Sequence, residues 1–307
     1  MSKEIITMGS INQDVFVNAD SYPKHGETVW VQSVNNQPGG KGANQAIALS
    51  KIGGKVTFIG AVGKDSQGKN MIENLKKYDI NTDFISVKDD VNTGTFIVIL
   101  DENGENTMLG TLGANNHLTE NDIQSAFDNT NAEYFLLQLE TNRGAIHRSL
   151  EIAKQKNIKI VLDPAPADGY QEEFLKYAHI VTPNQQEAEL ISGVKVIDKE
   201  SAEKAAKIIK SKGVDNVIVK LGDKGSLIHT NNESIFVSSY KVSAVNTVGA
   251  GDVFAAAMTV FLNDSDDIYS AVKFASAASA IKVSKAETQE AIPTYSEIID
   301  YMEKNEH

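Results

Sequence analysis

The chain alternates short runs rich in β-branched residues with segments of helical period. This alternation is typical of a parallel sheet wrapped by helices, so it predicts the α/β class. Segments 143–157 and 201–212 gather apolar side chains on one stripe and predict amphipathic helices. No Pro- or Ser-rich linker and no internal repeat separates the halves, which predicts a single domain over residues 1–307. The predicted strands are 4–9, 56–62, 134–140, 159–163, 179–182 and 216–220.

Two stretches, 14–38 and 91–113, depart from this rhythm. Apolar and polar residues alternate in both, and the second contains the turn-like segment 101–106. The pattern predicts a small antiparallel sheet outside the main one. A small sheet with one apolar face needs cover from the main domain or from a second copy of the chain. The two stretches therefore predict a lid, a dimer contact, or both.

Composition excludes several classes of protein. The 307 residues include 29 Lys and Arg against 41 Asp and Glu, a net charge of −12, which argues against a surface for nucleic acid or anionic membrane. The absence of cysteine excludes disulfides, thiolate metal sites and a cysteine nucleophile. The first residues lack the apolar core of a signal peptide, and no apolar run approaches the roughly 18 residues of a membrane helix. We expect a cytoplasmic protein.

Residues 246–252 read Asn-Thr-Val-Gly-Ala-Gly-Asp and precede the apolar run 253–262. The near-adjacent glycines favour a tight turn that brings backbone N–H groups to a ligand, and the run predicts a buried helix. The start of such a helix is a ready anion site. Asp252 in its first turn could take a proton from a hydroxyl while neighbouring amides hold the charge on a transferring phosphoryl group. The alternative, that Asp252 only complements the helix dipole, stays open here.

Residues 38–46 form a second glycine-rich turn before a predicted helix. Closely spaced glycines let the backbone approach a polyhydroxylated ligand, and Lys41 and Asn44 can donate to hydroxyl oxygens. It is not a Walker A loop, because Gly42 follows Lys41 where Ser or Thr is required. An ordinary glycine-rich loop is the alternative.

Residues 182–187 end a predicted strand and begin a helix. Asn184 and Glu187 lie three apart and could reach a hydrated Mg²⁺, but the same spacing is nearly that of a helix capping box. Residues 220–225 suit either a nucleotide-edge loop or a turn between strands. Asn12 and Asp14 follow the first strand, at the edge where open α/β sheets bind ligands.

Taken in order, these residues resemble the PfkB-type (ribokinase) family of carbohydrate kinases. The stretches that carry the resemblance are 9–14, 39–46, 138–140, 163–166, 182–187, 221–225 and 247–252. The resemblance implies a ribokinase-like three-layer α/β/α sandwich with a small β-sheet lid. It also implies transfer of the ATP γ-phosphoryl group to O5 of D-ribose, with 2-deoxyribose, fructose or a nucleoside as other acceptors. A sugar-binding regulator without turnover is the alternative of a different class.

The resemblance also assigns roles to residues. Asp252 would be the general base, beside an anion hole formed by Gly249, Ala250 and Gly251. The sugar would be held by Asn12, Asp14, Gly40, Lys41, Gly42, Asn44, Glu140 and Asp252. ATP would contact Asn184, Lys220, Leu221, Gly222, Asp223, Lys224, Gly225, Gly251 and Ser276. Glu187 and Asn184 would hold Mg²⁺ through water, and the lid would form a homodimer contact.

The chain departs from the family where an activating monovalent cation is bound. Members commonly have Asp-Thr where this chain has Asn246-Thr247, and Gly and Ser where it has Glu287 and Ala291. Because one carboxylate has become an amide, we expect weak or absent K⁺ dependence. Glu287 supplying the missing charge and Lys285 replacing the ion are both open at this stage. The positions concerned are Asn246, Val248, Lys282, Lys285, Glu287 and Ala291.

Overall fold

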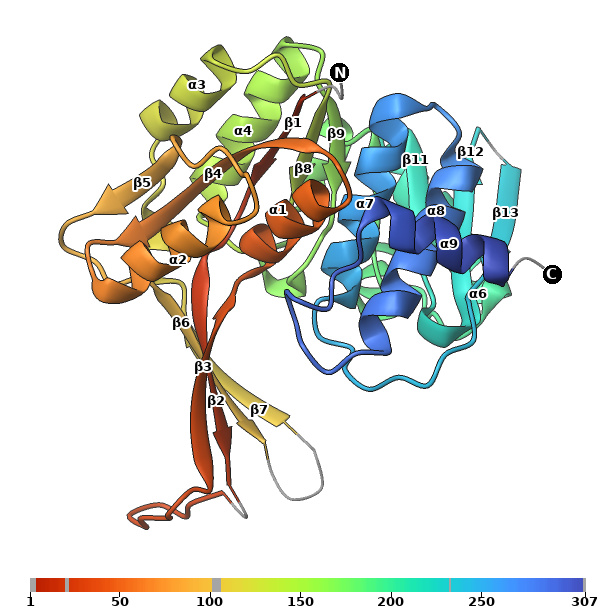
Figure 1. The fold of residues 1–307 in the computed structure, drawn as a ribbon. Helices are drawn as coiled ribbons and strands as arrows, with labels where there is room; N and C mark the ends of the chain where they lie inside the picture. Colours follow the sequence, from red (N-terminus) through yellow and green to blue (C-terminus); the bar gives the residue numbers. More distant parts are fainter. Residues whose placement is uncertain (1–3, 20–21, 101–105, 232, 306–307) are drawn as a thin grey trace.

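A computed structural model describes residues 4–19, 22–100, 106–231 and 233–305. Within this part of the chain, nine strands form one sheet in the order β13-β12-β11-β10-β9-β8-β1-β4-β5 (Figure 1). All six predicted strands are confirmed. The strands are β1 (Glu4–Met8), β4 (Lys55–Gly63), β5 (Ile85–Lys88), β8 (Tyr134–Leu137), β9 (Lys159–Leu162), β10 (Ile180–Val181), β11 (Asn216–Lys220), β12 (Gly225–Thr230) and β13 (Glu233–Ser238).

The sheet is parallel from β5 to β11, but β12 and β13 run antiparallel at the other edge. The sequence prediction of a parallel sheet is therefore wrong at this edge, and it omitted β5, β12 and β13. β13 is the edge strand, and most of its side chains are exposed or half-buried. It lacks the continuous apolar run that marks a strand buried on both faces.

Helices cover both faces of the sheet because adjacent strand residues point to opposite sides. Ile5 packs into one apolar cluster and Ile6 into the other, and Leu136 and Leu137 divide in the same way. The predicted helices at 143–157 and 201–212 are confirmed as α4 and α6. Among the described residues, no helix is long and apolar enough to cross a bilayer. One face is covered by α1 (Lys41–Lys51), α2 (Ser66–Lys76), α7 (Ala250–Asp264), α8 (Ile268–Val283) and α9 (Tyr295–Lys304), and the other by α3 (Glu120–Asp128), α4 (Arg143–Gln155), α5 (Gln185–Ser192) and α6 (Lys199–Ser211).

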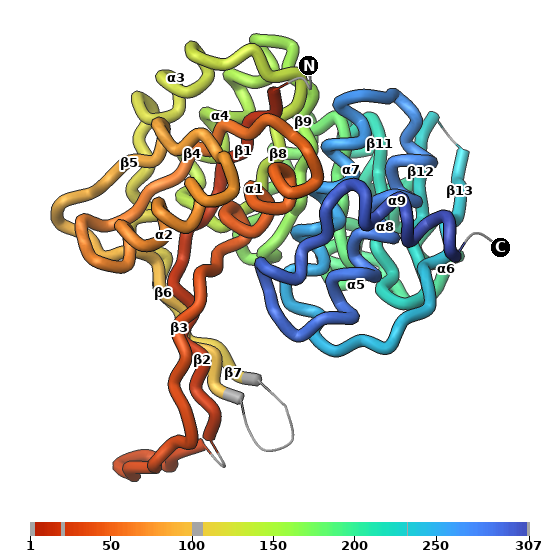
Figure 2. Tube along the Cα trace, viewed as in Figure 1, coloured from red at the N-terminus to blue at the C-terminus, as the bar shows by residue number. Residues whose placement is uncertain are grey.

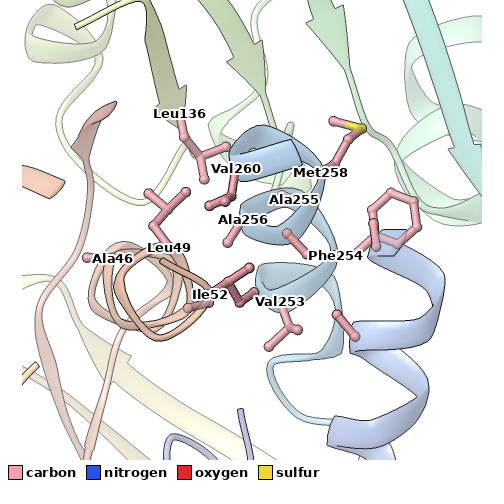
Figure 3. Packing of buried hydrophobic residues seen from close by; sticks show 14 of the residues in the cluster. Ala46, Leu49, Ile52, Leu136, Val253, Phe254, Ala255, Ala256, Met258 and Val260 are labelled. Atoms are coloured by element: carbon pink, nitrogen blue, oxygen red, sulfur yellow. The ribbon is translucent and has the colours of Figure 1, made fainter. Parts of the chain in front are cut away.

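Two helices far apart in the sequence, α1 and α7, pack against each other over the sheet. Figure 3 shows Leu49 of α1 and Ile52, which caps the C-terminal end of α1, facing Val253 and Val260 of α7, and all four side chains are buried. Each helix follows one of the two glycine-rich turns. This packing therefore brings the turns together, although more than 200 residues separate Gly40 from Gly249.

A second, smaller sheet projects from the body and has the strand order β3-β2-β6-β7 (Figures 1 and 2). The predicted antiparallel arrangement is correct for its outer pairs and wrong for its centre, because β2 and β6 are parallel. Residues 28–31, whose alternation predicted strand, lie outside the strands. Of the predicted turn at 101–106, residues 101–105 are outside the described residues, and Asn106 begins β7. The strands are β2 (Asn12–Asn18), β3 (Ser33–Gly39), β6 (Gly94–Leu100) and β7 (Asn106–Thr111).

Candidate active site

The carboxyl ends of the parallel strands meet at one edge of the main sheet. β1 has β4 on one side and β8 on the other, so the chain changes direction across the sheet at this point. Open α/β sheets bind ligands at such a switch point. The polar residues that end or follow strands β1, β8, β9, β10 and β11 are Asn12, Glu140, Asp163, Asn184 and Lys220.

Asp252 lies at the start of α7, beside this edge, and is only 5 % exposed. Gly249 precedes the helix with φ +77°, a backbone conformation that favours glycine, and among the described residues no side chain caps the helix start. The Asp252 carboxylate accepts hydrogen bonds from Asn44 Nδ2 at 3.2 Å and Gln45 Nε2 at 3.3 Å. Burial raises the pKa of Asp252 to about 6, although Lys41 opposes this rise. A buried carboxylate at the start of a helix can act as a base toward a bound hydroxyl.

The glycines before α1 place Asn44 in reach of Asp252. A Cβ on Gly40 would lie 2.7 Å from the Ser10 carbonyl oxygen, and one on Gly42 would lie 2.4 Å from the Gly9 backbone. These glycines therefore let the start of α1 press against the turn between β1 and β2. Their close approach is a structural reason for the motif, in addition to any contact with a ligand.

The orientation of Asn44 is fixed from the C-terminal part of the chain. Gln289, only 2 % exposed, donates from Nε2 to Asn44 Oδ1 at 2.9 Å. Asn74 Nδ2 donates in turn to Gln289 Oε1 at 2.9 Å. With its oxygen occupied in this way, Asn44 presents its amide N–H to Asp252. Gln289 is thus a positioning residue that the sequence alone did not reveal.

On one side of Asp252 the site is rich in hydrogen-bond acceptors. The Glu140 carboxylate accepts from the Ser10 hydroxyl and from Asn12 Nδ2, the latter at 3.4 Å. Asn115 Nδ2 donates to Asn12 Oδ1 at 2.8 Å and so fixes the amide of Asn12. Burial, with Glu140 and Asp252 nearby, raises the pKa of Asp14 to about 7. Such a group of acceptors suits a ligand with several hydroxyl groups.

On the other side of Asp252 lies a cavity of about 860 Å³. Lys41 and Asp252 form part of its wall, and so do Gly249, Ala250 and Gly251 at the start of α7. Its volume is in the range of small-molecule and cofactor sites. Lys41, predicted as a sugar contact, therefore borders this second space as well.

Lys220 brings positive charge to the turn before α7. Its ammonium forms an ion pair with Asp163 at 3.0 Å, and the two side chains are 14 % and 2 % exposed. The position of a Cβ on Gly251 would lie 3.5 Å from Lys220 Nζ, so the ammonium lies directly beside that glycine. Lys41 lies close by, and Asp252 above all raises its pKa, with further contributions from Asp163, Glu140 and Glu187. The amides, Lys41 and Lys220 together make this side attractive to phosphate.

Asn184 and Glu187 form the capping box that their spacing allowed. Asn184 Oδ1 accepts from the Glu187 backbone N–H at 2.9 Å, and Glu187 Oε2 accepts from the Asn184 backbone N–H at 2.8 Å. Both residues also border the cavity, and burial raises the pKa of Glu187. Across the described residues, no three His, Cys, Asp or Glu side chains cluster as metal ligands. A divalent ion here would keep several waters, as Mg²⁺ commonly does.

The loop at 220–225 is a turn between β11 and β12 whose residues divide between two environments. Gly222, Asp223 and Gly225 border the cavity, as does Ser276 on α8. Leu221 is 1 % exposed and belongs to the hydrophobic core. Lys224 donates from Nζ to the Ile197 carbonyl at 2.7 Å, away from the cavity wall. The segment is therefore a turn between strands, and only part of it borders the cavity.

Two of the residues expected near a monovalent cation, Asn246 and Lys282, are hydrogen-bonded to each other. Asn246 Nδ2 donates to the Ala286 carbonyl at 2.6 Å, and Lys282 Nζ donates to the Asn246 carbonyl at 2.9 Å. Glu287 is exposed. Lys285 pairs with Glu297 at 3.8 Å. Val248 is 38 % exposed and Ala291 is buried.

Sequence reasoning missed several partners of the predicted residues. Asp163 was only part of a resembling stretch, yet it accepts from Lys220, Gln45 and Thr182 at the centre of the site. Its position after a buried strand was a usable signal. No signal in the sequence pointed to Gln289 or Asn115, because their contacts with Asn44 and Asn12 span 245 and 103 residues.

Known proteins share this fold. The family model "pfkB family carbohydrate kinase" matches residues 2–295, and the chain belongs to this family. It is 36 % identical to the ribokinase of Haemophilus influenzae over 304 residues, which cover 99 % of each protein. It is 32 % identical to the deoxyribokinase of Salmonella typhi, and the match covers 99 % of this chain and 100 % of that protein. The structure of Arabidopsis thaliana ribokinase complexed with ribose and ATP superposes with a TM-score of 0.91 at 28 % identity, covering 98 % of this chain and 99 % of that one. The predicted ribokinase-like α/β fold is confirmed.

Proposed function

We propose that this chain transfers the γ-phosphoryl group of ATP to O5 of D-ribose and releases D-ribose 5-phosphate. The observation that carries the proposal is the position of Asp252, a buried carboxylate between the acceptor-rich group of side chains and the cavity lined by Lys41 and Lys220. The likeness to ribokinases over nearly the whole chain supports ribose as the acceptor.

Asp252 is the general base in this proposal. With a pKa of about 6 it is mostly ionised at neutral pH and still basic enough to accept a proton from the attacking hydroxyl. Asn44 and Gln45 hold its two oxygens in place. Phosphoryl transfer needs little covalent participation by the protein, so aligning the hydroxyl is most of the work on this side.

The turn before α7 stabilises the charge on the transferring group. The amides of Gly249, Ala250 and Gly251 lie at a helix start, where an anion is favoured. Lys220 beside Gly251 adds a cation, and Asp163 keeps its ammonium in place. Lys41 reaches the same space from α1. These residues act when the phosphoryl group is between donor and acceptor.

ATP occupies the cavity, bordered by Asn184, Gly222, Asp223, Gly225 and Ser276. Mg²⁺ would be held there through water by Glu187 and Asn184, which fits two residues whose side chains are already hydrogen-bonded to each other. The ion would neutralise charge on the ATP phosphates. A K⁺ site does not fit the residues around Asn246, for the reasons given above.

The small sheet acts as a lid and as a dimer contact in the same proposal, within a single kinase domain over residues 1–307. Asn12 and Asp14 belong to β2, so hydroxyls that bind them also fix the base of the small sheet. Closure would exclude water, which otherwise competes with the sugar for the phosphoryl group. Apolar side chains exposed on and beside this sheet favour burial against a second copy in a homodimer, in the cytoplasm. These side chains are Trp30, Val34, Ile97, Met108 and Leu109.

The test is ADP formation with ATP and a panel of ribose, 2-deoxyribose, fructose and nucleosides. We expect ribose to give the highest kcat/KM, because a site that hydrogen-bonds a hydroxyl discriminates strongly against an analogue that lacks it. A preference for 2-deoxyribose would mean that the acceptor is 2-deoxyribose and that the type of reaction is as proposed. Sugar binding measured by calorimetry without ADP formation would favour a regulator instead.

A further inference from the structure

Lys282 is a buried lysine that the proposed chemistry does not use. It lies in the last turn of α8 and is 0 % exposed. Its Nζ donates to the Asn246 carbonyl oxygen at 2.9 Å. Burial lowers the pKa of Lys282, while the Asp252 carboxylate opposes this change. Lysine is almost never fully buried without a compensating partner, so this position calls for a reason.

The segment that contains Asn246 leads directly into the anion-binding turn, and α8 holds it at several points. The backbone N–H groups of Val245 and Asn246 both donate to the Val283 carbonyl, at 2.7 and 3.1 Å. Ser279 Oγ donates to the Ala250 carbonyl at 3.0 Å. The turn before Asp252 is thus attached to the C-terminal half of α8, with Lys282 at the centre of the attachment.

We propose that the ammonium of Lys282 is a built-in cation that fixes the turn at 246–251 and takes the place of a bound monovalent ion. Two carbonyls that could ligate an ion there are engaged, since Asn246 O accepts from Lys282 and Ala286 O accepts from the Asn246 amide. The side chain at 246 is neutral, so it brings no carboxylate to balance a second positive charge. The Lys282 ammonium is part of the chain, so it supplies a positive charge at this place without the need to bind an ion from solution.

Lys282 is a positioning residue, because it acts through the Asn246 carbonyl and not on the reactants. Fixing one carbonyl fixes the peptide plane that it belongs to, and hence the N–H of Thr247 on the opposite side. The amides of the turn are thereby held before a phosphoryl group arrives, as electrostatic preorganisation requires. The effect on turnover rests on the proposed kinase function, whereas the effect on the turn itself does not.

The experiment compares the wild type with Lys282→Ala, Lys282→Met and the control Lys273→Met in sodium, potassium, ethylammonium and choline chloride at equal ionic strength. Lys273 lies on the same helix, with its Nζ 6.0 Å from the Tyr269 ring centroid. The readouts are the thermal unfolding midpoint and kcat. The midpoint keeps the test valid even if ribose phosphorylation fails, so the two proposals can be separated.

We expect the wild type and Lys273→Met to have the same midpoint and kcat in all four salts. Lys282→Ala should lose about 10- to 100-fold in kcat, the usual cost of losing a residue that orients a functional group. Potassium or ethylammonium should then raise both its midpoint and its kcat with saturation. Lys282→Met, whose side chain fills the same space without charge, should lose activity and show no rescue.

Three results would overturn the inference. One is a marked rise in the wild-type midpoint or kcat when potassium replaces sodium. Another is full activity in Lys282→Met. The third is a folded Lys282→Ala protein whose thermal midpoint and kcat are the same in all four salts. If Lys282→Ala does not fold, the wild-type salt series and Lys282→Met still decide.

Discussion

Two groups of side chains meet at Asp252, and they differ in the charge that they offer. The group around Asn12, Asp14 and Glu140 consists of carboxylates and amides, and the pKa of Asp14 there is raised to about 7. The group around the cavity brings together Lys41, Lys220 and the amides at the start of α7. Carboxylates are thus crowded where a ligand would bring neutral hydroxyl donors, and cations gather where a ligand would bring phosphates. Asp252 lies on the boundary.

The largest expected effect comes from removing the charge at this boundary. Asp252→Asn should lower kcat about 1,000-fold, because the attacking hydroxyl loses its base. The KM values for ribose and ATP should change little, since the two neighbouring groups remain. Steady-state ADP formation measures both. Asp89→Asn is a matched control, because Asp89 forms an exposed ion pair with Lys64 and is not part of the cavity wall. Near-wild-type turnover by Asp252→Asn would show that the boundary carboxylate is not the base.

A smaller effect should follow from changing the cationic group alone. Lys220→Met should lower kcat about 100-fold through lost stabilisation of the transferring charge, with a weaker effect on the KM for sugar. The same change leaves the buried Asp163 carboxylate without its ion-pair partner, which itself destabilises the fold.

The double variant Lys220→Met/Asp163→Asn separates these two causes. It removes the unpaired charge, so its thermal midpoint should recover relative to Lys220→Met while kcat stays low. Recovery of kcat together with the midpoint would mean that Lys220 contributes only stability.

The smallest effect concerns Asp14. Asp14→Asn should stabilise the fold above pH 7 but lower kcat/KM for ribose. A carboxyl pKa raised from 3.8 to about 7 means that the folded state holds this proton more tightly, so the Asp14 contribution to the unfolding free energy falls as pH rises from about 4 to 7. Asp14→Asn should therefore raise the thermal midpoint above pH 7, by the equivalent of about 1–2 kcal/mol for a half-buried group, and leave it unchanged near pH 4.

The pH dependence of kcat/KM for ribose should also depend on Asp14, and here the ionised carboxylate is favourable. In the wild type, kcat/KM for ribose should decline as pH falls through about 7 and then through about 6, as Asp14 and Asp252 take up protons. Asp14→Asn should have a lower kcat/KM and lose the upper of the two transitions. Retention of both transitions in Asp14→Asn would assign the upper one to another group.

The sequence predicted those parts of the fold that have a local cause. Strands such as β1 and β8 are buried on both faces and therefore appear as apolar runs. The half-exposed edge strand β13 has no such run and was missed. The parallel pairing of β2 with β6 was also beyond reach, because it joins segments about 80 residues apart and alternation alone does not set direction.

The candidate site divides in the same way. Its glycine turns and the Asn184 capping box are local, and the structure contains both at the predicted places. The side chains that orient Asn12 and Asn44 come from distant parts of the chain, so only the fold reveals them. The engagement of Lys282 with Asn246 is of the same kind, and the sequence analysis did not foresee it.

The most direct test of the proposed function is a crystal structure with ribose and a non-hydrolysable ATP analogue bound together. We expect ribose O5 within about 3.2 Å of an Asp252 carboxylate oxygen, in hydrogen-bond reach for proton transfer. We also expect O5 to face the terminal phosphorus in line with the bond to be broken, with that phosphate against Gly251 and Lys220. An Asp252 carboxylate that remains with Asn44 and Gln45 and contacts no sugar hydroxyl would contradict it.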